Sequence, residues 1–476
     1  MLELPMASPR CCGPSTGVQL GDTTLGSTRA WCPMCGKPEH ALYSDTGSGV
    51  FMDRVCPRQG SVRTPVCRTG QWFMDRVWQP RPIRQGGVRV PAAKGCPLDC
   101  GPCANHAGRL RLPIFSITNN CNLACPICFT HNRRDAVYNK TADELEALLD
   151  VIEAESRDLD LLNLTGGEPT LHPEIFDILE RCSRRSFRRV SMNSNGLIIG
   201  RDRAFAEKLG ETGVQVILSL DTLDSGKSMR IHGRDIVEDK LAALAALEEL
   251  NISTVLLPVW IPGVNDDELP ALISEYLPKP FISAVTVQNM AYTGHHGSRF
   301  SPRVHSTVED VEHALATEGF GASDFFAPGS CHALCYSTAY YIMDGGRRLP
   351  LTRLVDPGLL TAGTAESYLL RPSRELEAAF REGVDTLWAS GAERDDLLLL
   401  RRFIARHEED LANGGRAFHD MVKTVTIHAH MDEDTFDLAR VSLCGDLVPD
   451  ENGAMIPACS YNLLYRRKDP RFWVEE

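Results

Sequence analysis

The middle of the chain alternates short runs of apolar and β-branched residues with longer amphipathic segments. In the segment 141–156, apolar residues recur at helical spacing from Leu145 to Ile152, and Thr141 stands three residues before Glu144 as in a capping box. This segment therefore predicts a helix. The same alternation predicts strands at 112–117, 159–165, 188–194, 214–220, 253–260 and 283–289, and further helices at 172–182, 202–212, 237–250 and 266–277.

Strands that alternate with helices in this way predict βα units around a mainly parallel sheet. We expect an α/β fold in which these units form a partial (β/α)6 barrel over residues 109–295. In such barrels the functional loops follow the carboxyl ends of the strands. The segments at these positions are the cysteine-bearing loop 118–129, TGGEPT at 165–170, NSNG at 193–196, SLDT at 219–222 and WIPGVND at 260–266.

The loop after the first expected strand, TNNCNLACPICF, carries Cys121, Cys125 and Cys128 at C-x3-C-x2-C spacing. A loop offers little apolar surface for burying three thiols, whereas this spacing lets the sulfurs converge on one inorganic group. A [4Fe-4S] cube usually takes four thiolates. A loop with three cysteines leaves one iron open for a reactive ligand, so we predict a catalytic [4Fe-4S] cluster here.

The net charge of the chain limits the kinds of molecule that we expect it to bind. The 476 residues carry a formal net charge of −13 and no dense basic tract, which argues against binding to nucleic acid. Apolar runs such as 254–262 are far shorter than a membrane span, and the amino-terminal residues lack the pattern of a signal peptide. We expect a cytoplasmic protein without a transmembrane segment.

The chain has 17 cysteines, and an odd number without an export signal favours metal or cluster ligation over disulfides. Cys32, Cys35 and Cys56 supply three ligands for a mononuclear Fe or Zn. Cys67 is a candidate for the fourth ligand. Cys11 and Cys12 fall in the amino-terminal tail, outside these groups.

Two further cysteine groups predict auxiliary [4Fe-4S] clusters. Cys96, Cys100 and Cys103 share a glycine-rich loop, with His106 or a distant cysteine as the fourth ligand. Four thiolates from two distant segments would ligate the second cluster, and the alternative is four separately buried thiols; these residues are Cys331, Cys335, Cys444 and Cys459.

Three other residues have an ordinary structural interpretation. Cys182 shares a helical face with apolar neighbours and is expected in the core. His428 and His430 alternate on one expected strand face, and we interpret them as structural histidines. The pentapeptide FMDRV occurs at 51–55 and again at 73–77, which indicates either a duplicated β-hairpin or a coincidence.

The cysteine loop, together with Gly166, Gly167 and Glu168 in a GGEP motif after the second strand, resembles the radical S-adenosylmethionine (SAM) superfamily. The resemblance implies that the open iron chelates SAM and that an electron from the cluster cleaves SAM to a 5′-deoxyadenosyl radical. It also implies that Ile127 contacts adenine and that the Glu168 region receives the SAM ammonium. Candidates for ribose or carboxylate contacts are Asn193, Asn195, Ser219 and Asp221; a turn or a helix cap is the alternative for each.

The order of the cysteine groups, from about Trp31 to Tyr465, resembles the tetraether lipid synthase and class D radical SAM methyltransferase group. That group implies auxiliary clusters, a mononuclear metal and bond formation at unactivated carbons, either by joining lipid alkyl chains or by methylating a pterin. Gln59 stands where that group has a histidine. A peptide maturase and a non-enzymatic zinc-ribbon interaction protein are the alternatives.

The resemblance also implies partners and a domain order. We expect a small-molecule or lipid substrate, peripheral contact with membrane lipid, and a reductase with flavodoxin or ferredoxin as electron donor. The expected regions are a disordered tail at 1–30, a cysteine-rich metal and cluster domain at 31–108, the radical SAM core at 109–295 and an auxiliary-cluster domain at 296–476.

Overall fold

The structure is a computed structural model that describes residues 22–473, except 57, 59, 80–90, 102, 131, 133–134, 157–158, 345–346, 371–372, 390, 392 and 414–420. Cys11, Cys12 and Gln59 lie outside the described residues. Strand β1 (Thr23–Cys32) begins inside the expected tail. The prediction of disorder over 1–30 is therefore wrong from Thr23 onward.

The six predicted strands exist and lie side by side in the predicted order. Each pairs in parallel with its neighbour in one continuous sheet. A short extra strand, β10 (Val259–Trp260), pairs with the last of them. The six strands are β5 (Leu112–Thr118), β6 (Leu161–Gly166), β7 (Arg189–Ser194), β8 (Gln215–Leu218), β9 (Thr254–Leu256) and β11 (Ile282–Asn289).

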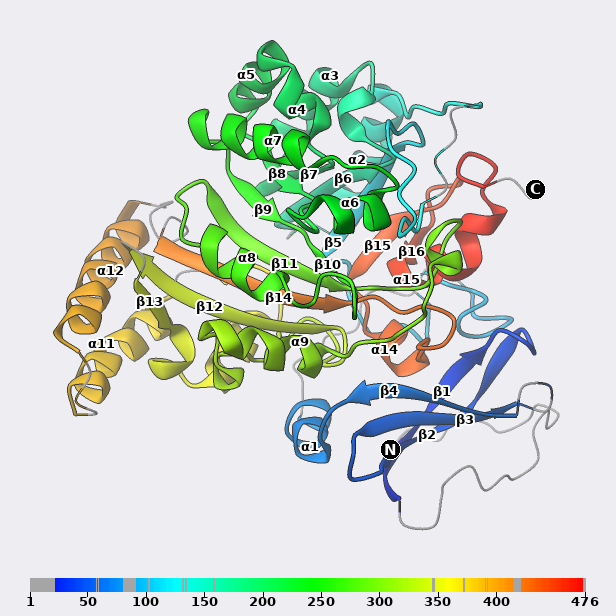
Figure 1. Cartoon of the computed structure of the whole chain (residues 1–476), viewed down its shortest axis with the longest axis horizontal. Helices are drawn as coiled ribbons and strands as arrows, with labels where there is room; N and C mark the ends of the chain where they lie inside the picture. The colour runs from blue at the N-terminus through cyan, green and yellow to red at the C-terminus, as the bar shows by residue number, and fades with distance from the viewer. Residues whose placement is uncertain are drawn as a thin grey trace.

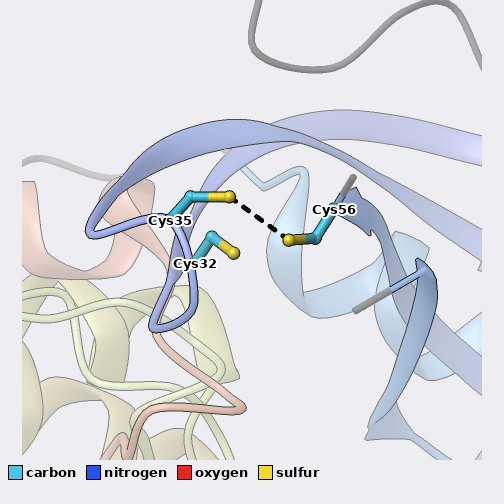
Figure 2. Close-up of side chains that lie close together, drawn as sticks. All are labelled: Cys32, Cys35 and Cys56. Carbon is cyan, nitrogen blue, oxygen red and sulfur yellow. Dashed lines mark hydrogen bonds between the residues drawn. The ribbon is translucent and has the colours of Figure 1, made fainter. Parts of the chain in front are cut away.

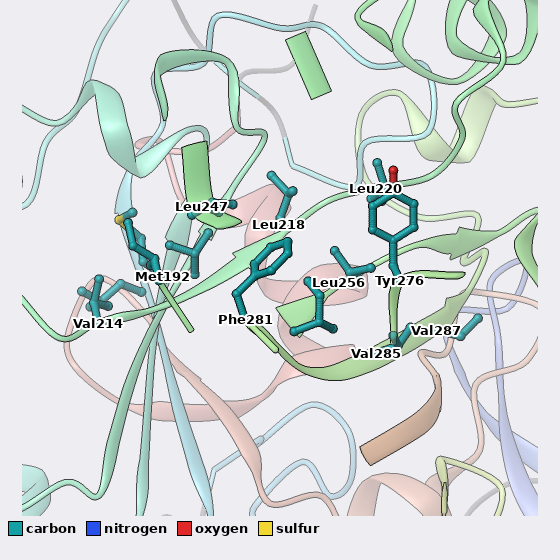
Figure 3. Packing of buried hydrophobic residues seen from close by; sticks show 14 of the residues in the cluster. Met192, Val214, Leu218, Leu220, Leu247, Leu256, Tyr276, Phe281, Val285 and Val287 are labelled. Atoms are coloured by element: carbon teal, nitrogen blue, oxygen red, sulfur yellow. The ribbon is translucent and has the colours of Figure 1, made fainter. Parts of the chain in front are cut away.

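Helices between these strands cover the outer face of the sheet (Figure 1). Thr141 and Glu144 form the predicted capping box at the start of the first one. Met192, Leu218, Leu247 and Phe281 pack in the core between sheet and helices (Figure 3). The helices are α2 (Ala142–Glu155), α3 (Ile175–Ser183), α4 (Leu197–Arg201), α5 (Arg203–Glu211), α6 (Ser225–His232), α7 (Val237–Glu249) and α8 (Leu269–Tyr276).

The carboxyl-terminal region extends the same sheet at both edges. Strand β14 (Val422–Ala429) pairs in parallel with β11, and β12 (Tyr336–Asp344) and β13 (Arg347–Pro350) follow it. At the other edge, β15 (Asp446–Pro449) pairs in parallel with β5 and carries β16 (Met455–Pro457). The region 296–476 therefore shares one sheet with the strands of residues 112–289. The free edges of the barrel sheet offer unpaired backbone groups, which these strands satisfy.

The remaining helices flank the extended sheet. Helices α11 and α12 form the end of the molecule beside β12 and β13 (Figure 1). Within the described part of the chain, no helix combines the length and apolar character needed to cross a bilayer. The helices here are α9 (Val308–Leu315), α10 (Pro357–Gly363), α11 (Arg374–Ala389), α12 (Arg394–Asn413), α14 (Leu438–Ser442) and α15 (Ala458–Ser460), the last continuing into the turns η6 (Tyr461–Tyr465) and η7 (Arg466–Lys468).

The amino-terminal region forms its own antiparallel sheet, in which β1 is followed by β2 (Lys37–Asp45), β3 (Val50–Cys56) and β4 (Gly60–Cys67). Helix α1 (Gly70–Val77) follows this sheet. The first FMDRV copy lies in β3 and the second in α1, so the hypothesis of a duplicated hairpin is wrong.

Candidate active site

The cysteine loop that follows β5 brings Cys121, Cys125 and Cys128 together. Burial raises the pKa of the Cys125 thiol, and Cys128 and Cys121 raise it further because three thiolates repel one another. A cube holds its ligands on separate iron atoms, so three thiolates from one loop suit a [4Fe-4S] cluster.

Each sulfur of this loop also has a nearby hydrogen-bonding group. Thr130 Oγ1 lies 2.9 Å from Cys128 Sγ, and His232 Nδ1 lies 3.8 Å from Cys125 Sγ. The Leu123 amide donates to Cys121 Sγ at 3.4 Å. Such contacts orient ligands and adjust the potential of a bound cluster.

The GGEP turn is fastened directly to this loop. The amide of Gly167 donates to Thr118 O, and the amide of Glu168 donates to Asn120 O, both at 2.7 Å. A Cβ on Gly166 would stand 2.2 Å from Thr118 O, and one on Gly167 would stand 2.1 Å from Asn120 O. Only glycine permits this approach of two backbones.

Glu168 braces the ends of two strands. Its buried carboxylate accepts hydrogen bonds from Thr170 Oγ1 at 2.7 Å, Ser194 Oγ at 2.8 Å and the Asn195 amide at 2.7 Å. Burial raises the pKa of the Glu168 carboxyl, and these hydrogen bonds oppose the rise because they stabilise the charged form. Among the described residues, the Asn195 amide is the single donor to Glu168 Oε2. Because a carboxylate oxygen has two lone pairs, Oε2 can also accept a hydrogen bond from the ammonium group of a ligand.

Sequence reasoning missed Lys240, which is 1% exposed beneath the strand ends. Its ammonium donates to Asn195 O and Ser219 O at 2.6 Å and to Ser219 Oγ at 2.9 Å. The signal was available, because Lys240 shares the buried face of α7 with Ala243 and Leu247.

The other predicted cofactor contacts lie around the same loops. Asp221 is buried and accepts the Val259 amide at 2.7 Å, with His232 Nε2 at 3.7 Å. Asn193 Oδ1 accepts a hydrogen bond from Asn163 Nδ2 at 2.8 Å. Ile127, within the cysteine loop, packs against the apolar cluster of Tyr292.

Alternate residues of the central strands face a partly open chamber of about 250 Å³. On β6, Leu161, Asn163 and Thr165 line the chamber, whereas Leu162 and Leu164 point into the core. The chamber reaches the cysteine loop, since the two residues after Cys128 also line it. Its apolar wall includes Leu112, Ile114, Phe129, Ile217, Val255, Leu257 and Val448.

A polar group closes one part of the chamber. The buried carboxylate of Asp446 accepts from Tyr336 Oη at 2.6 Å and Tyr368 Oη at 2.7 Å. His428 stacks on Tyr336 with ring centroids 4.0 Å apart. Burial lowers the pKa of His430 to about 4, so both its ring nitrogens serve as neutral hydrogen-bonding groups. Both histidines line the chamber, which their interpretation as structural residues did not foresee.

The structure places the four carboxyl-terminal cysteines beside this polar group, with Cys331 and Cys459 buried and Cys335 and Cys444 half-buried. Burial raises the pKa of Cys444, and Asp446, Cys459 and Cys335 raise it further. The Arg440 Nε donates to Cys335 Sγ at 3.3 Å. Cys331 belongs to the same region, because its charge acts on Tyr336 and Tyr368.

The loop of Cys96, Cys100 and Cys103 packs against the carboxyl-terminal segment. A hydrogen bond between the thiols of Cys96 and Cys100 lowers the pKa of Cys96 and raises the pKa of Cys100. The Cys100 amide donates to Tyr465 Oη at 2.9 Å. His106 Nε2 lies 2.9 Å from the carbonyl oxygen of Cys444, which links this loop to the carboxyl-terminal group.

The amino-terminal triad has the spacing of a single-ion site. The sulfurs of Cys35 and Cys56 lie 3.2 Å apart, and all three ligand atoms, including that of Cys32, lie within 4.8 Å (Figure 2). The hydrogen bond with Cys56 raises the pKa of the Cys35 thiol to about 12. Tetrahedral Zn or Fe sites place thiolates at about 2.3 Å from the metal, which suits this separation. Cys67 pairs with Val50 at the opposite end of the β3–β4 hairpin, so its prediction as fourth ligand is wrong.

The second close triad of the described residues is an ion-pair network. His305 Nε2 lies 2.9 Å from Asp432, whose carboxylate also accepts the Tyr292 amide and Thr435 Oγ1. Asp434 pairs with Arg303 at 2.9 Å. These contacts occupy the carboxylates and stabilise the loop that follows β14.

Residues 115–275 match the sequence profile of the Radical SAM superfamily. This segment, about a third of the chain, is therefore similar to a radical SAM domain. Domains of this superfamily bind SAM and a [4Fe-4S] cluster and need an electron donor. The match is inconsistent with the alternative of a non-enzymatic zinc-ribbon protein.

The chain is also similar to individual proteins of known name. It is 22% identical to the 7,8-dihydro-6-hydroxymethylpterin dimethyltransferase of Methanocaldococcus jannaschii, over 93% of this chain and 94% of that protein. It is 33% identical to the probable GTP 3′,8-cyclase of Pyrococcus horikoshii, over 33% of this chain and 48% of that protein. The chain thus spans nearly all of the first relative and about half of the second.

Solved structures with a similar fold cover part of the chain. Streptococcus suis SuiB bound to precursor peptide SuiA shares 20% identity with a TM-score of 0.38, over 45% of this chain and 46% of SuiB. The methylornithine synthase PylB shares 16% identity with a TM-score of 0.35, over 44% of this chain and 63% of PylB.

Proposed function

We propose that the protein is a radical SAM methyltransferase that forms a C–C bond on a small, pterin-like ring held in the chamber. The observation that carries the proposal is the chamber itself, about 250 Å³ in volume and next to the cysteine loop. The similarity to a pterin dimethyltransferase over nearly the whole of both chains supports it.

The size of the chamber favours a small substrate over the others considered. An apolar cavity of about 150 Å³ binds one benzene molecule, so 250 Å³ suits a two-ring compound. Two long lipid alkyl chains or a folded peptide segment need far more enclosed volume. Methylation of a small molecule is thus preferred over alkyl coupling and peptide maturation.

The residues divide the work of such a reaction. Cys121, Cys125 and Cys128 are the proposed ligands of the [4Fe-4S] cluster, which with SAM supplies a 5′-deoxyadenosyl radical. The radical would take a hydrogen atom from a substrate C–H bond to give 5′-deoxyadenosine, and the substrate carbon radical would add to the methylene carbon of methylenetetrahydrofolate. The electron donor would supply the electrons, and solvent the protons, that break the bond from this carbon to the folate nitrogen, so that tetrahydrofolate leaves and a methyl group stays on the substrate. The apolar wall excludes water, while the Asp446 group and Asn163 orient the ring.

The other cysteine groups complete the proposed cofactor set. The triad at Cys32, Cys35 and Cys56 would hold one Fe or Zn ion, with a fourth ligand from outside the three. Two auxiliary [4Fe-4S] clusters would bind at the remaining groups, which are Cys96, Cys100 and Cys103, and Cys331, Cys335, Cys444 and Cys459.

The direct test is product formation by the anaerobically reconstituted enzyme. The protein would be incubated with SAM, a one-electron reductant, methylenetetrahydrofolate and 7,8-dihydro-6-hydroxymethylpterin, and products identified by mass spectrometry. We expect a methylated pterin together with 5′-deoxyadenosine. A matched variant, Leu257→Trp, fills the chamber wall and should keep SAM cleavage while losing the product. Release of 5′-deoxyadenosine without methylated pterin from the unmodified enzyme would contradict the proposal.

A further inference from the structure

Arg466 places a buried positive charge in the wall of the chamber. Its side chain begins the turn η7 and is 3% exposed. Tyr461 and Phe129 lie under the guanidinium, with the ring centroids at 4.9 Å and 5.8 Å. The rings offer the cation their negative faces and seal it from water on that side.

The guanidinium is only partly satisfied. Nε and Nη2 both donate to Asn462 Oδ1, at 3.2 Å and 2.8 Å, and Nη1 is buried without a hydrogen-bond partner. The adjacent carboxylate, Asp469, accepts two hydrogen bonds from Arg471, at 2.9 Å and 2.6 Å, and one from Tyr461. Among the residues that the structure describes, no carboxylate forms an ion pair with Arg466.

A charge in this state needs a counter-ion. Burial lowers the pKa of Arg466, yet a guanidinium keeps its proton in proteins. Leaving a buried charge unpaired is strongly destabilising, whereas a bound anion both neutralises it and accepts the free Nη1 proton. The free donor and the chamber therefore indicate an anionic ligand.

The position of Arg466 favours substrate over SAM as the source of that anion. The proposed SAM contacts Ser219 and Asn195 lie at the ends of β8 and β7, where Lys240 already supplies a buried cation. Arg466 follows β16, the strand at the edge of the sheet that lies beyond β5 and β15. There it lines the chamber with Phe129, the last residue of the cysteine loop, and lies close enough to Cys128 for the two charges to interact.

We infer that Arg466 binds an oxyanion, a phosphate ester or a carboxylate, carried by the substrate of this chamber. Asn462 holds the guanidinium plane through Nε and Nη2, which aims Nη1 as the donor to the ligand. The inference rests on the proposed function in one respect, namely that the chamber is the substrate site. It does not depend on the ring being a pterin.

The test measures binding to the reconstituted enzyme with SAM already bound. Inorganic pyrophosphate, 7,8-dihydro-6-hydroxymethylpterin and the phosphate ester of that pterin would be titrated separately by calorimetry. We expect the enzyme to bind pyrophosphate and to prefer the phosphate ester over the free pterin. Arg466→Gln should weaken binding of both phosphate compounds at least about tenfold, since a charged hydrogen bond is lost. Arg467→Gln, which removes the neighbouring exposed guanidinium, is the matched control and should change neither affinity.

The outcomes separate this inference from the proposed function. Dependence of pyrophosphate binding on Arg466, with neither pterin bound, would retain the oxyanion site and reject the pterin. Pterin binding without preference for the phosphate ester would overturn the inference alone. Weakened SAM binding by Arg466→Gln, with pyrophosphate unaffected, would assign the charge to SAM and overturn it as well. If Arg466→Gln loses iron, Arg466→Lys is the variant to measure. We expect Arg466→Lys to bind pyrophosphate several-fold more weakly than the unmodified enzyme does. Equal affinity of the two proteins would overturn the inference.

Discussion

At the scale of single residues, the sulfur atoms of this protein differ in what surrounds them. Cys125 lies among two other thiols, His232 and the charge of Lys240. Cys182 is more deeply buried than Cys125 and sits on α3 among apolar side chains of the core. Burial alone therefore does not mark a ligand, whereas the convergence of three thiols from one loop does.

This contrast gives the first prediction. Cys125→Ala should abolish reductive cleavage of SAM, because loss of one of three thiolates releases the cube. Cys182→Ala should cost about 1 kcal/mol of stability and leave cleavage intact. The yield of 5′-deoxyadenosine per protein, measured beside iron content, distinguishes the two. Equal loss in both variants would refute Cys125 as a ligand.

The second prediction concerns Asp221. Burial, partly offset by Lys240 and the Val259 amide, raises its pKa from 3.8 to about 6. The folded state then binds the proton more tightly than the unfolded chain, so this contribution to stability is full below pH 4 and is lost as the pH rises through 6. Asp221→Asn should remove up to about 3 kcal/mol of this pH dependence.

Urea unfolding of both proteins between pH 4 and pH 6.5 measures the difference. Asp385→Asn, on the exposed face of α11, controls for loss of one surface carboxylate. A stability difference between Asp221→Asn and the unmodified protein that stays constant with pH would contradict the prediction.

At the scale of residues, the sequence predicted the cysteines as ligands but did not predict the charged residues that lie around the site. Ligand thiols repeat at short spacing, which a local pattern records. Lys240, Asp446 and Arg466 act on groups far away in the sequence, so only the fold brings them into the site. A charged residue within an apolar helical stripe, as at Lys240, is the one local sign that was available.

At the scale of elements, the GGEP turn and the cysteine loop behave as one unit, because two backbone hydrogen bonds join them. Gly167→Ala should therefore separate the turn from Asn120, where the new Cβ would stand 2.1 Å from the carbonyl oxygen. We expect weaker SAM binding, by tenfold or more for a loss of about 1.4 kcal/mol.

The matched control for this variant is Gly210→Ala. Its Cβ would meet Ile252 only at ordinary contact distance, 3.6 Å, within helix α5. This change should raise the free energy of unfolding by up to about 1 kcal/mol and leave SAM affinity unchanged. Equilibrium dialysis with labelled SAM measures both variants, and equal affinities would show that the close approach is dispensable.

Helices and strands were predictable from the sequence where the spacing of apolar residues and the length of the segment indicated the same type of element. The six strands and the helices between them alternate regularly, and all of them appear in the structure. The pentapeptide FMDRV shows the limit, since it is strand in β3 and helix in α1. Its second copy follows Thr69, which caps the helix by accepting the Trp72 amide, and its Phe73 packs in the core of the amino-terminal sheet.

At the scale of the whole molecule, the carboxyl-terminal cysteines connect distant parts of the chain beside the chamber. Cys444→Ala or Cys459→Ala should lower the iron content and abolish product formation while keeping SAM cleavage. The reason is that the cysteine loop after β5 does not need this region, whereas the polar end of the chamber contacts it. Iron analysis and the ratio of methylated product to 5′-deoxyadenosine measure the effect. Unchanged iron and turnover in both variants would exclude a cluster there.

The sheet edges carry a consequence for how the protein is made. Leu112, at the start of β5, pairs with Asp446, and β11 pairs with a strand that begins at Val422. During synthesis, therefore, the early strands wait with open edges until the ribosome has translated almost the entire chain. Closing a loop of this length is slow. Until these last strands pair, the cysteine loop follows a strand whose sheet edge is open.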